Sequence, residues 1–265
     1  MLYVTNLLKL QEMNQLNHVD EFHKALADYK LSHTAIKTLS EVRLLLMVAP
    51  SASGRNTIIR ELVKTDRYHF IVSDTTRNPR INNGVPEENG REYWFRTEEE
   101  VLKEIKKGEF LEAAVIHNQQ VSGISVRELE SARKDGKVAI TDIEIVGAAN
   151  IHRAKPDTDI LFMVPPSFDI WLERIHSRGT MPEDELIRRL ESAEEELSTA
   201  LRSDYYRFVL NDTVEGTTAE IDRFASTGYY DPFKEQLSKE VAQNLYKRVK
   251  KYLAVWRQEH SLDSK

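Results

Sequence analysis

The stretch Glu41–Arg60 reads EVRLLLMVAPSASGRNTIIR, and it decides the fold that the sequence predicts. Its apolar run Leu44–Val48 is typical of a short buried strand. Six small residues follow at 49–54, and Arg55 then opens a pattern with apolar residues at helical spacing. A strand, a tight turn and a helix N-terminus in this order indicate a phosphate-binding loop, because backbone N–H groups and the helix dipole converge there on an anion.

The loop departs from the usual pattern G-x-x-x-x-G-K-[ST]. Ala49 stands at the first glycine and Arg55 at the lysine. Asn56 stands where a hydroxyl residue would bind magnesium, and Thr57 follows one place later. On this stretch alone, an ordinary strand-to-helix turn therefore remains an alternative. The residues predicted to line the ATP phosphates are Ser51, Ala52, Ser53, Gly54, Arg55, Asn56 and Thr57.

The composition is that of a chain with a sizeable core. Of 265 residues, 40% are hydrophobic and 30% are charged, which suits one large domain or one domain with appendages. No apolar run approaches the roughly 20 residues of a membrane span, and the N-terminus does not resemble a secretory signal. The lack of cysteine excludes disulfides and thiolate metal sites, and it fits a cytoplasmic location. The net charge of −6 argues against a nucleic-acid-binding role.

Short apolar strands alternate with helices in the rest of the chain. We expect strands near 68–73, 92–95, 110–117, 138–143, 160–164 and 208–211, and we expect a turn at 119–124. Helices are expected at 97–107, 125–134, around 148–152, and at 168–176, 182–201 and 214–224. This alternation predicts a parallel sheet with helices on both faces, and ligands bind such sheets at the C-terminal ends of the strands.

Several polar residues fall at those strand ends. Arg77 and Arg80 lie three apart in the segment DTTRNPR, which predicts a cationic loop for a second anion. The expected strand at 138–143 ends in Asp142 and Glu144. Glu112 lies within an apolar strand, where a carboxylate is unfavourable unless it is paired.

Both ends of the chain are predicted to be helical appendages. Residues 1–40 form a mostly helical extension in which we identify no chemistry, and residues 227–265 form a long amphipathic helix. We favour docking of this last helix on the main domain, although self-association or a protein partner through the terminal helices stays open. Its predicted apolar positions are Phe233, Leu237, Val241, Leu245, Val249, Leu253 and Trp256.

Nine short motifs follow one another between residues 42 and 224. They are APSASGRNT, VSDTTRNPR, GREYWF, GEFLEAAVIH, TDIEIVGA, FMVPPS, SRGT, IRRL and VLND. In this order and spacing, the sequence resembles the guanylate kinase family of P-loop nucleoside monophosphate kinases. The resemblance implies an α/β P-loop kinase-type domain over 41–226, with an acceptor-binding region at about 73–125 and a helical lid at about 174–202.

The resemblance also implies roles for individual residues. Arg178 and Arg189 match arginines on the lid side that surround the transferring phosphoryl group, so Arg55, Arg178 and Arg189 are the expected catalytic residues. Asn211 matches a position near the adenine of ATP. The implied magnesium ligands are Asn56, Thr57 and Asp142. The implied GMP-binding residues are Ser73, Arg77, Arg80, Tyr93, Glu112, Ser122, Asp142 and Glu144.

The function implied by the resemblance is ATP- and Mg²⁺-dependent conversion of GMP to GDP. The retained lid arginines favour this enzyme. The altered phosphate loop favours an alternative, a non-catalytic binding module of the same fold for a phosphorylated or acidic ligand or partner. A kinase of another small phosphorylated metabolite also stays open, because Ser122-Gly123-Ile124 lacks two hydroxyl groups that the family has there.

Overall fold

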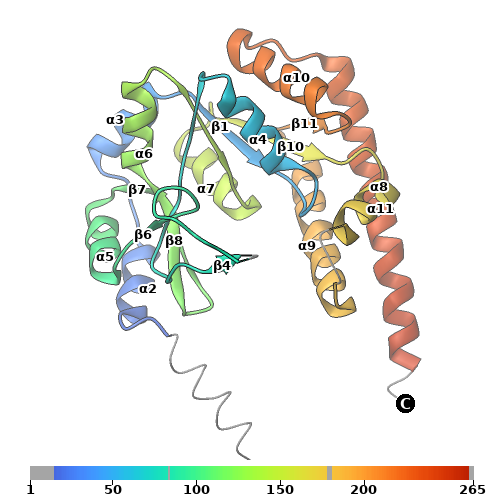
Figure 1. The fold of residues 1–265 in the computed structure, drawn as a ribbon, viewed down its shortest axis with the longest axis horizontal. Helices are drawn as coiled ribbons and strands as arrows, with labels where there is room; N and C mark the ends of the chain where they lie inside the picture. The colour runs from blue at the N-terminus through green and yellow to red at the C-terminus, as the bar shows by residue number, and fades with distance from the viewer. Residues whose placement is uncertain (1–14, 83, 178–180, 263–265) are drawn as a thin grey trace, which may run out of the picture. The chain divides into compact units, whose positions relative to one another are not determined.

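The computed structural model describes residues 15–82, 84–177 and 181–262 (Figure 1). The chain divides into two compact units. Unit 1 comprises Met1–Arg43 and His69–Ala139, and unit 2 comprises Leu44–Tyr68 and Ile140–Lys265. The division of the sequence into an extension, a main domain and a terminal helix stays a prediction.

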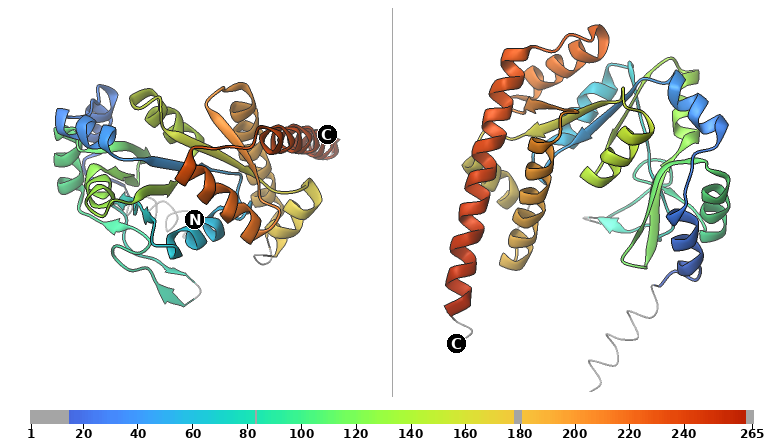
Figure 2. Two further views of the ribbon diagram at one scale, coloured as in Figure 1. Left: turned by 90° about the horizontal axis from the view of Figure 1, so that it is seen from above. Right: turned by 180° about the vertical axis from the view of Figure 1, so that it is seen from behind.

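The main sheet has five strands in the order β11-β10-β1-β9-β2, and helices flank it on both faces (Figures 1 and 2). Strand β1 pairs in parallel with β10, and β10 pairs in parallel with β11. All five residues of β1 are buried, which explains its uninterrupted apolar sequence. The predicted fold class is therefore confirmed. The strands are β1 Leu44–Val48, β2 Tyr68–Phe70, β9 Val138–Asp142, β10 Asp159–Val164 and β11 Tyr206–Leu210.

The helices of unit 2 begin close to the predicted positions. Ser167 caps α8, and its hydroxyl accepts from the N–H of Ile170 at 3.2 Å. The predicted long charged helix is α9, which runs for 20 residues. The helices are α4 Arg55–Lys64, α7 Ile145–Ala154, α8 Phe168–His176, α9 Glu183–Arg202, α10 Val214–Thr227 and α11 Pro232–Leu262.

Unit 1 contains a second sheet with the strand order β6-β3-β8-β7. Its strands are β3 Asp74–Thr75, β6 Trp94–Phe95, β7 Phe110–Ile116 and β8 Gln120–Ser125, and a short hairpin joins β4 Ile81–Asn82 to β5 Val85–Pro86. Helices α2 Val19–Ala27, α3 His33–Glu41, α5 Glu98–Lys107 and α6 Val126–Lys134 complete the unit. Helix α2 buries Phe22 in a core shared with Val101, Ile105 and Phe110, so the described part of the N-terminal extension packs against this unit.

The predicted turn at 119–124 is wrong for residues 120–124, because they belong to β8, which pairs antiparallel with β7. The turn lies earlier, at His117 and Asn118, whose φ values of 51° and 57° suit a tight hairpin. Gly123 misled the sequence interpretation. A Cβ atom at this position would lie 2.4 Å from the carbonyl oxygen of Glu112 on the neighbouring strand, so the glycine permits close strand contact.

Helix α11 docks on unit 2, but not with the whole predicted face. Leu245, Val249 and Leu253 are buried, whereas Phe233 is 79% exposed and Leu237 is 45% exposed. Residues spaced strictly four apart advance about 40° around a helix at each step, so the first members of the row turn away from the buried side. Among the described residues, no helix combines the length and the apolarity that crossing a membrane requires.

Candidate active site

A cavity of about 210 Å³ opens at the loop between β1 and α4. Residues 49–56 line it together with Ile143, Glu144 and Glu196. Within the described ranges, the backbone N–H groups of Ala52, Gly54 and Asn56 have no acceptor. Unpaired N–H groups at a helix N-terminus, facing a polar cavity, form a site for an anion such as a phosphate.

Two loop residues adopt left-handed backbone conformations, Ala52 with φ 64° and Gly54 with φ 93°. Gly54 is required, because a Cβ atom there would lie 2.4 Å from Nδ2 of Asn211. For Ala52 this left-handed conformation is about 1 kcal/mol less favourable than it would be for glycine. Ala52 is thus the loop residue at which a side chain opposes the backbone conformation. Ala49 is not among the residues with positive φ, so its side chain causes no such strain.

The carbonyl groups of the loop are held by side chains from α8 and the end of β11. Nε1 of Trp171 donates to the oxygen of Ser51 at 2.7 Å, and Nδ2 of Asn211 donates to the oxygen of Ser53 at 2.6 Å. Arg174 also donates to the Ser53 oxygen, at 3.4 Å. These bonds fix the loop through its carbonyl groups and leave its N–H groups available. The sequence interpretation missed Trp171 and Arg174, although their spacing places them on one side of a helix.

The guanidinium group of Arg55 lies at the base of the loop. Its Nη2 donates to Oδ2 of Asp142 at 3.0 Å, and its Nη1 donates to the carbonyl oxygen of Ile143 at 3.3 Å. Nη1 also lies 3.5 Å from the carbonyl oxygen of Met47. Arg55 therefore joins the ends of β1 and β9. Asp142, expected to bind GMP or magnesium, is its ion-pair partner here.

Glu196 of α9 also faces this cavity, and the sequence interpretation missed it. Its Oε2 atom is buried and has no hydrogen-bond partner in the described part of the chain. Burial raises the pKa of Glu196 to about 7, with Glu144 and Glu195 adding to the rise and Arg55 opposing it. The sequence feature that could have revealed the burial of Glu196 is its position in α9, next to the apolar residue Leu197 and three residues after Ala193.

We expect Glu196→Gln to change how stability depends on pH. The folded-state pKa of about 7 exceeds the ordinary glutamate value of 4.5, so the folded protein holds a proton that the unfolded chain loses as pH rises between these values. The wild-type free energy of unfolding should fall through this window. The variant should be about 2 kcal/mol more stable than wild type near pH 8, and about equal to it near pH 5. Urea denaturation at both pH values measures this, with the exposed Glu195→Gln as control; an equal difference at both values would contradict it.

The other predicted donor-side residues are placed as follows. Nη1 of Arg189 lies 3.4 Å from Oγ of Ser51, and its Nε donates to Glu185 at 2.9 Å, so Arg189 reaches the loop from α9. Asn56 is exposed at the cavity, and the hydroxyl of Thr57 lies 3.5 Å from Nη2 of Arg60. Arg178 lies outside the described residues.

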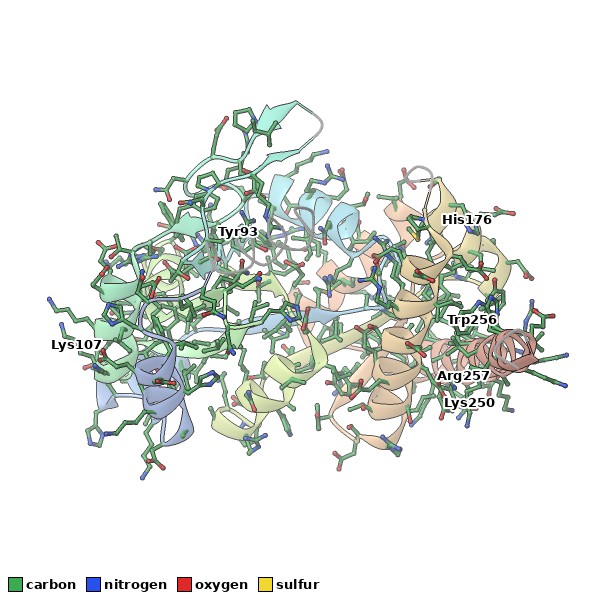
Figure 3. The ribbon with its side chains drawn as sticks, turned by 90° about the horizontal axis from the view of Figure 1, so that it is seen from below. Tyr93, Lys107, His176, Lys250, Trp256 and Arg257 are labelled. Carbon is green, nitrogen blue, oxygen red and sulfur yellow. The ribbon has the colours of Figure 1, made fainter. Side chains whose placement is uncertain are left out.

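Unit 1 holds the predicted phosphate-binding arginines. Arg77 forms a two-point ion pair with Glu87, with its Nη1 at 2.6 Å and its Nη2 at 2.9 Å from the two carboxylate oxygens. Its guanidinium also lies over the ring of Tyr93, 4.8 Å from the centroid (Tyr93 is labelled in Figure 3). The Arg77 and Glu87 side chains are only 12% and 6% exposed. Arg80 is exposed, and its guanidinium has no partner among the residues described here.

The remaining predicted acceptor residues lie on or beside the second sheet. Oγ of Ser122 donates to Oγ1 of Thr75 at 2.9 Å, across the pairing of β3 with β8. Glu112 and Ser122 lie on one face of this sheet, because Glu112 pairs with Ile124 and strand residues alternate between faces. Ser73 directly precedes β3, and its carbonyl oxygen accepts from the N–H of Trp94 at 2.9 Å. Glu112 is half-buried and has an interaction partner.

The structure thus gathers the predicted residues into two sets. Unit 1 contains Ser73, Arg77, Arg80, Tyr93, Glu112 and Ser122, whereas Asp142 and Glu144 belong to unit 2 beside the phosphate loop. Glu87, which the sequence interpretation missed, is the partner that holds Arg77. Its sequence context, two adjacent acidic residues in the loop VPEENG, did not show which arginine it would pair with.

A parallel sheet whose first strand enters an anion-binding loop at a helix N-terminus defines the P-loop kinase class of proteins. The family model described as guanylate kinase matches residues 41–227. On this match the chain belongs to the guanylate kinase family.

Individual relatives agree with this assignment. The chain is 37% identical to the guanylate kinase of Corynebacterium efficiens over 182 residues, which is 68% of this chain and 92% of the relative. It is 37% identical to the guanylate kinase of Thermotoga maritima over 174 residues, covering 65% and 81% of the two chains. The crystal structure of guanylate kinase from Anaplasma phagocytophilum shares the fold, with a TM-score of 0.51 at 24% identity, over 73% of this chain and 89% of that chain.

Proposed function

We propose that this chain transfers the γ-phosphoryl group of ATP to GMP and releases ADP and GDP. Membership of the guanylate kinase family supports this reaction. The observation that carries it in the structure is the cavity at the phosphate loop, where Ala52, Gly54 and Asn56 present N–H groups without acceptors among the described residues. ATP and GMP are then the partners of the chain, and a cytoplasmic location is part of the proposal.

In this proposal the acceptor nucleotide binds to unit 1. The exposed Arg80 and the remaining N–H groups of Arg77 would bind the phosphate, with Ser73 and the phenol of Tyr93 adding hydrogen bonds. The carboxylate of Glu112 would accept from guanine N–H groups, and Ser122 lies on the same sheet face. Glu87 keeps Arg77 in place, so the phosphate meets a guanidinium that is already oriented.

The donor phosphates would bind at the loop of unit 2. Phosphoryl transfer requires positioned reactants and positive charge around the three equatorial oxygens. Arg189, which reaches Ser51, and Arg178 would supply that charge at the γ-phosphoryl group. Arg55 would add positive potential from the base of the loop. Asn211 would keep the loop in shape through its bond to Ser53.

Magnesium fits this donor site as a companion of ATP. Among the described residues, no group of three acidic or histidine side chains could hold a metal ion alone. Mg²⁺ keeps several waters and commonly binds through few protein ligands and the substrate phosphates, which suits the oxygens of Asn56 and Thr57. When bound, it neutralises charge on the β- and γ-phosphates. Asp142 would have to contribute its other oxygen, because its Oδ2 already accepts from Arg55.

A coupled ADP-release assay with ATP, magnesium and each of GMP, dGMP, AMP, UMP and CMP tests the proposal. Turnover that is fastest with GMP is the expected result. Calorimetric titration of GMP should accompany the assay, because GMP binding without turnover would support the binding module instead. The observation that favours this second candidate is Arg55, whose guanidinium is engaged with Asp142 and with carbonyl groups. Turnover with a different acceptor would support the alternative of a kinase that acts on another small phosphorylated metabolite.

We expect Arg55→Lys to keep or raise the rate of phosphoryl transfer. Lysine is the usual residue at this position of a phosphate loop, and it retains the positive charge. The steady-state kcat should stay within about threefold of wild type or exceed it, whereas thermal stability should fall slightly because the bond to Asp142 changes. Arg60→Lys, on the same helix, is the matched control. Complete loss of turnover in Arg55→Lys would show that the guanidinium itself is required.

A further inference from the structure

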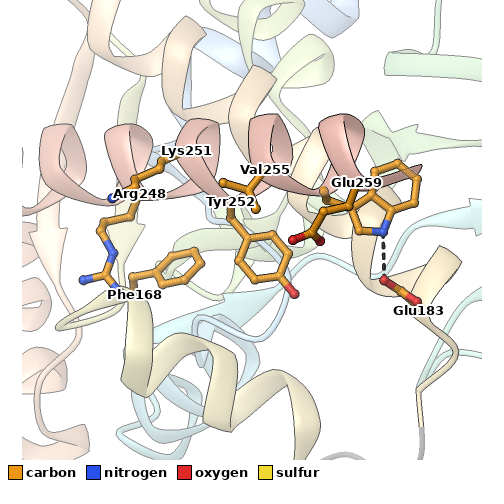
Figure 4. A pocket seen from close by; sticks show the side chains of 8 residues that line it. Phe168, Glu183, Arg248, Lys251, Tyr252, Val255 and Glu259 are labelled. Carbon is orange, nitrogen blue, oxygen red and sulfur yellow. Dashed lines mark hydrogen bonds between the residues drawn. The ribbon is translucent and has the colours of Figure 1, made fainter. Parts of the chain in front are cut away.

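Helix α11 lies beyond residue 227, where the family match ends, and it forms one wall of a second cavity of about 550 Å³ (Figure 4). The aromatic rings of Phe168, Tyr252 and Trp256 line this groove, together with Val255. Lys251 and Glu259 carry opposite charges at its edge. The groove is therefore partly apolar and carries both signs of charge.

Most of the polar groups around this groove already have partners within the chain. Nη2 of Arg248 lies 2.8 Å from Oδ1 of Asp169, and its guanidinium lies 4.9 Å from the ring centroid of Phe168. Nε1 of Trp256 donates to Glu183 at 2.8 Å, as the dashed line in Figure 4 shows. These bonds hold α11 against α8 and α9, and they give the groove fixed walls.

Lys251 and Glu259 are the exception. Both are exposed, and within the described ranges neither has an ion-pair or hydrogen-bond partner. Lys251 lies four residues before Val255 and Glu259 lies four residues after it, each about 6 Å from Val255 along the helix axis. Val255 is an apolar side chain that is 47% exposed. The three residues form one stripe along the helix, with a positive end, an apolar centre and a negative end.

This stripe is complementary to itself when two such helices run antiparallel. We propose that α11 pairs with α11 of a second copy of this chain, around a two-fold axis at Val255. Lys251 then faces the partner's Glu259, and Glu259 faces the partner's Lys251. In a two-fold interface every such contact occurs twice, so a single unpaired lysine and a single unpaired glutamate suffice for both contacts.

The charge pattern favours a second copy over an unrelated helix, and it also fixes the register. A shift that brings Arg248 opposite the partner's Glu259 would break the bond between Arg248 and Asp169. The register centred on Val255 breaks no bond to α8 or α9. This register also brings the exposed Val255 into contact with Val255 of the second copy, beside the Tyr252 ring. The apolar surface of both valine side chains is then removed from water.

The test is the oligomeric state of the full chain, measured by sedimentation equilibrium. At about 10 μM and low salt, wild type should have twice the 30.7 kDa mass of one chain. Lys251→Glu and Glu259→Lys each replace two attractions by two repulsions, so each should raise the dimer dissociation constant about tenfold or more. An equal mixture of the two variants should form dimers again, and so should the double variant, because both arrangements restore opposite charges.

Lys250→Glu is the matched control, since it makes the same charge change about 100° around the helix from Lys251. It should leave the mass unchanged, and circular dichroism should show equal helix content in all variants. A wild-type chain that stays monomeric at about 100 μM would overturn the proposal, as would unchanged dimers in the single variants. Single variants that dissociate but do not recombine on mixing would also overturn it. None of these outcomes depends on GMP turnover.

Discussion

Gly54→Ala is expected to lower kcat/KM for phosphoryl transfer by about a hundredfold, which corresponds to roughly 2.7 kcal/mol of transition-state stabilisation. The added Cβ would lie 2.4 Å from Nδ2 of Asn211, and the backbone φ of 93° is unfavourable for alanine. Asn211 is 4% exposed and donates to Ser53 from a packed position. The loop must therefore move, and its N–H groups lose their arrangement around the donor phosphates.

The measurement is steady-state kinetics combined with calorimetric titration of ATP. Gly228→Ala is the control, because Gly228 has φ 71° and a Cβ atom there would meet no atom within 4 Å, so it reports backbone strain without a clash. Both variants should lose some thermal stability, but only Gly54→Ala should lose ATP affinity. Normal ATP binding by Gly54→Ala would show that the loop conformation is not what holds the phosphates.

Arg77→Ala is expected to raise the KM for GMP by about 30- to 100-fold, because a phosphate loses charge-assisted hydrogen bonds. This change should also lower the stability of the folded chain. Glu87 would remain as a buried carboxylate that has lost its two-point ion pair, although the N–H of Arg80 still donates to it at 2.8 Å. Removing one member of a buried ion pair is strongly unfavourable, and we expect a loss of about 3 kcal/mol in the free energy of unfolding.

Arg80→Ala separates the two effects. Its guanidinium is exposed and has no partner in the described part of the chain, so the substitution should raise the KM for GMP about tenfold without changing stability. Initial-rate kinetics with varied GMP and urea denaturation of both variants provide the comparison. If Arg77→Ala lowers stability but leaves the KM for GMP unchanged, Arg77 supports the loop and does not bind the acceptor phosphate.

The sequence predicted those features that depend on neighbouring residues. The apolar run of β1, the helix that follows the small residues of the loop and the helix at 168–176 are local patterns, and the structure confirms each of them. Gly123 was misread because its role is close contact with Glu112 on another strand, which no local pattern reveals.

The candidate site was harder to predict, because its side chains are placed by distant partners. Arg55 meets Asp142 from 87 positions away, and Trp171 reaches Ser51 from 120 positions away. Glu196 gains its raised pKa only when α9 buries it. Residue types and spacing predicted the phosphate loop and the arginines, but they could not show which charges would pair within the folded chain.

The attachment of α11 also has a consequence for where the folding unit ends. Arg248, Trp256 and Arg257 bind Asp169, Glu183 and Glu191, so three bonds connect this helix to α8 and α9. Leu245, Val249 and Leu253, on the inner side of α11, are buried. A shortened protein cut at the family boundary would lose these contacts and expose the apolar surface that they cover. The family match therefore ends before the packed unit of this chain ends, because that unit includes α11.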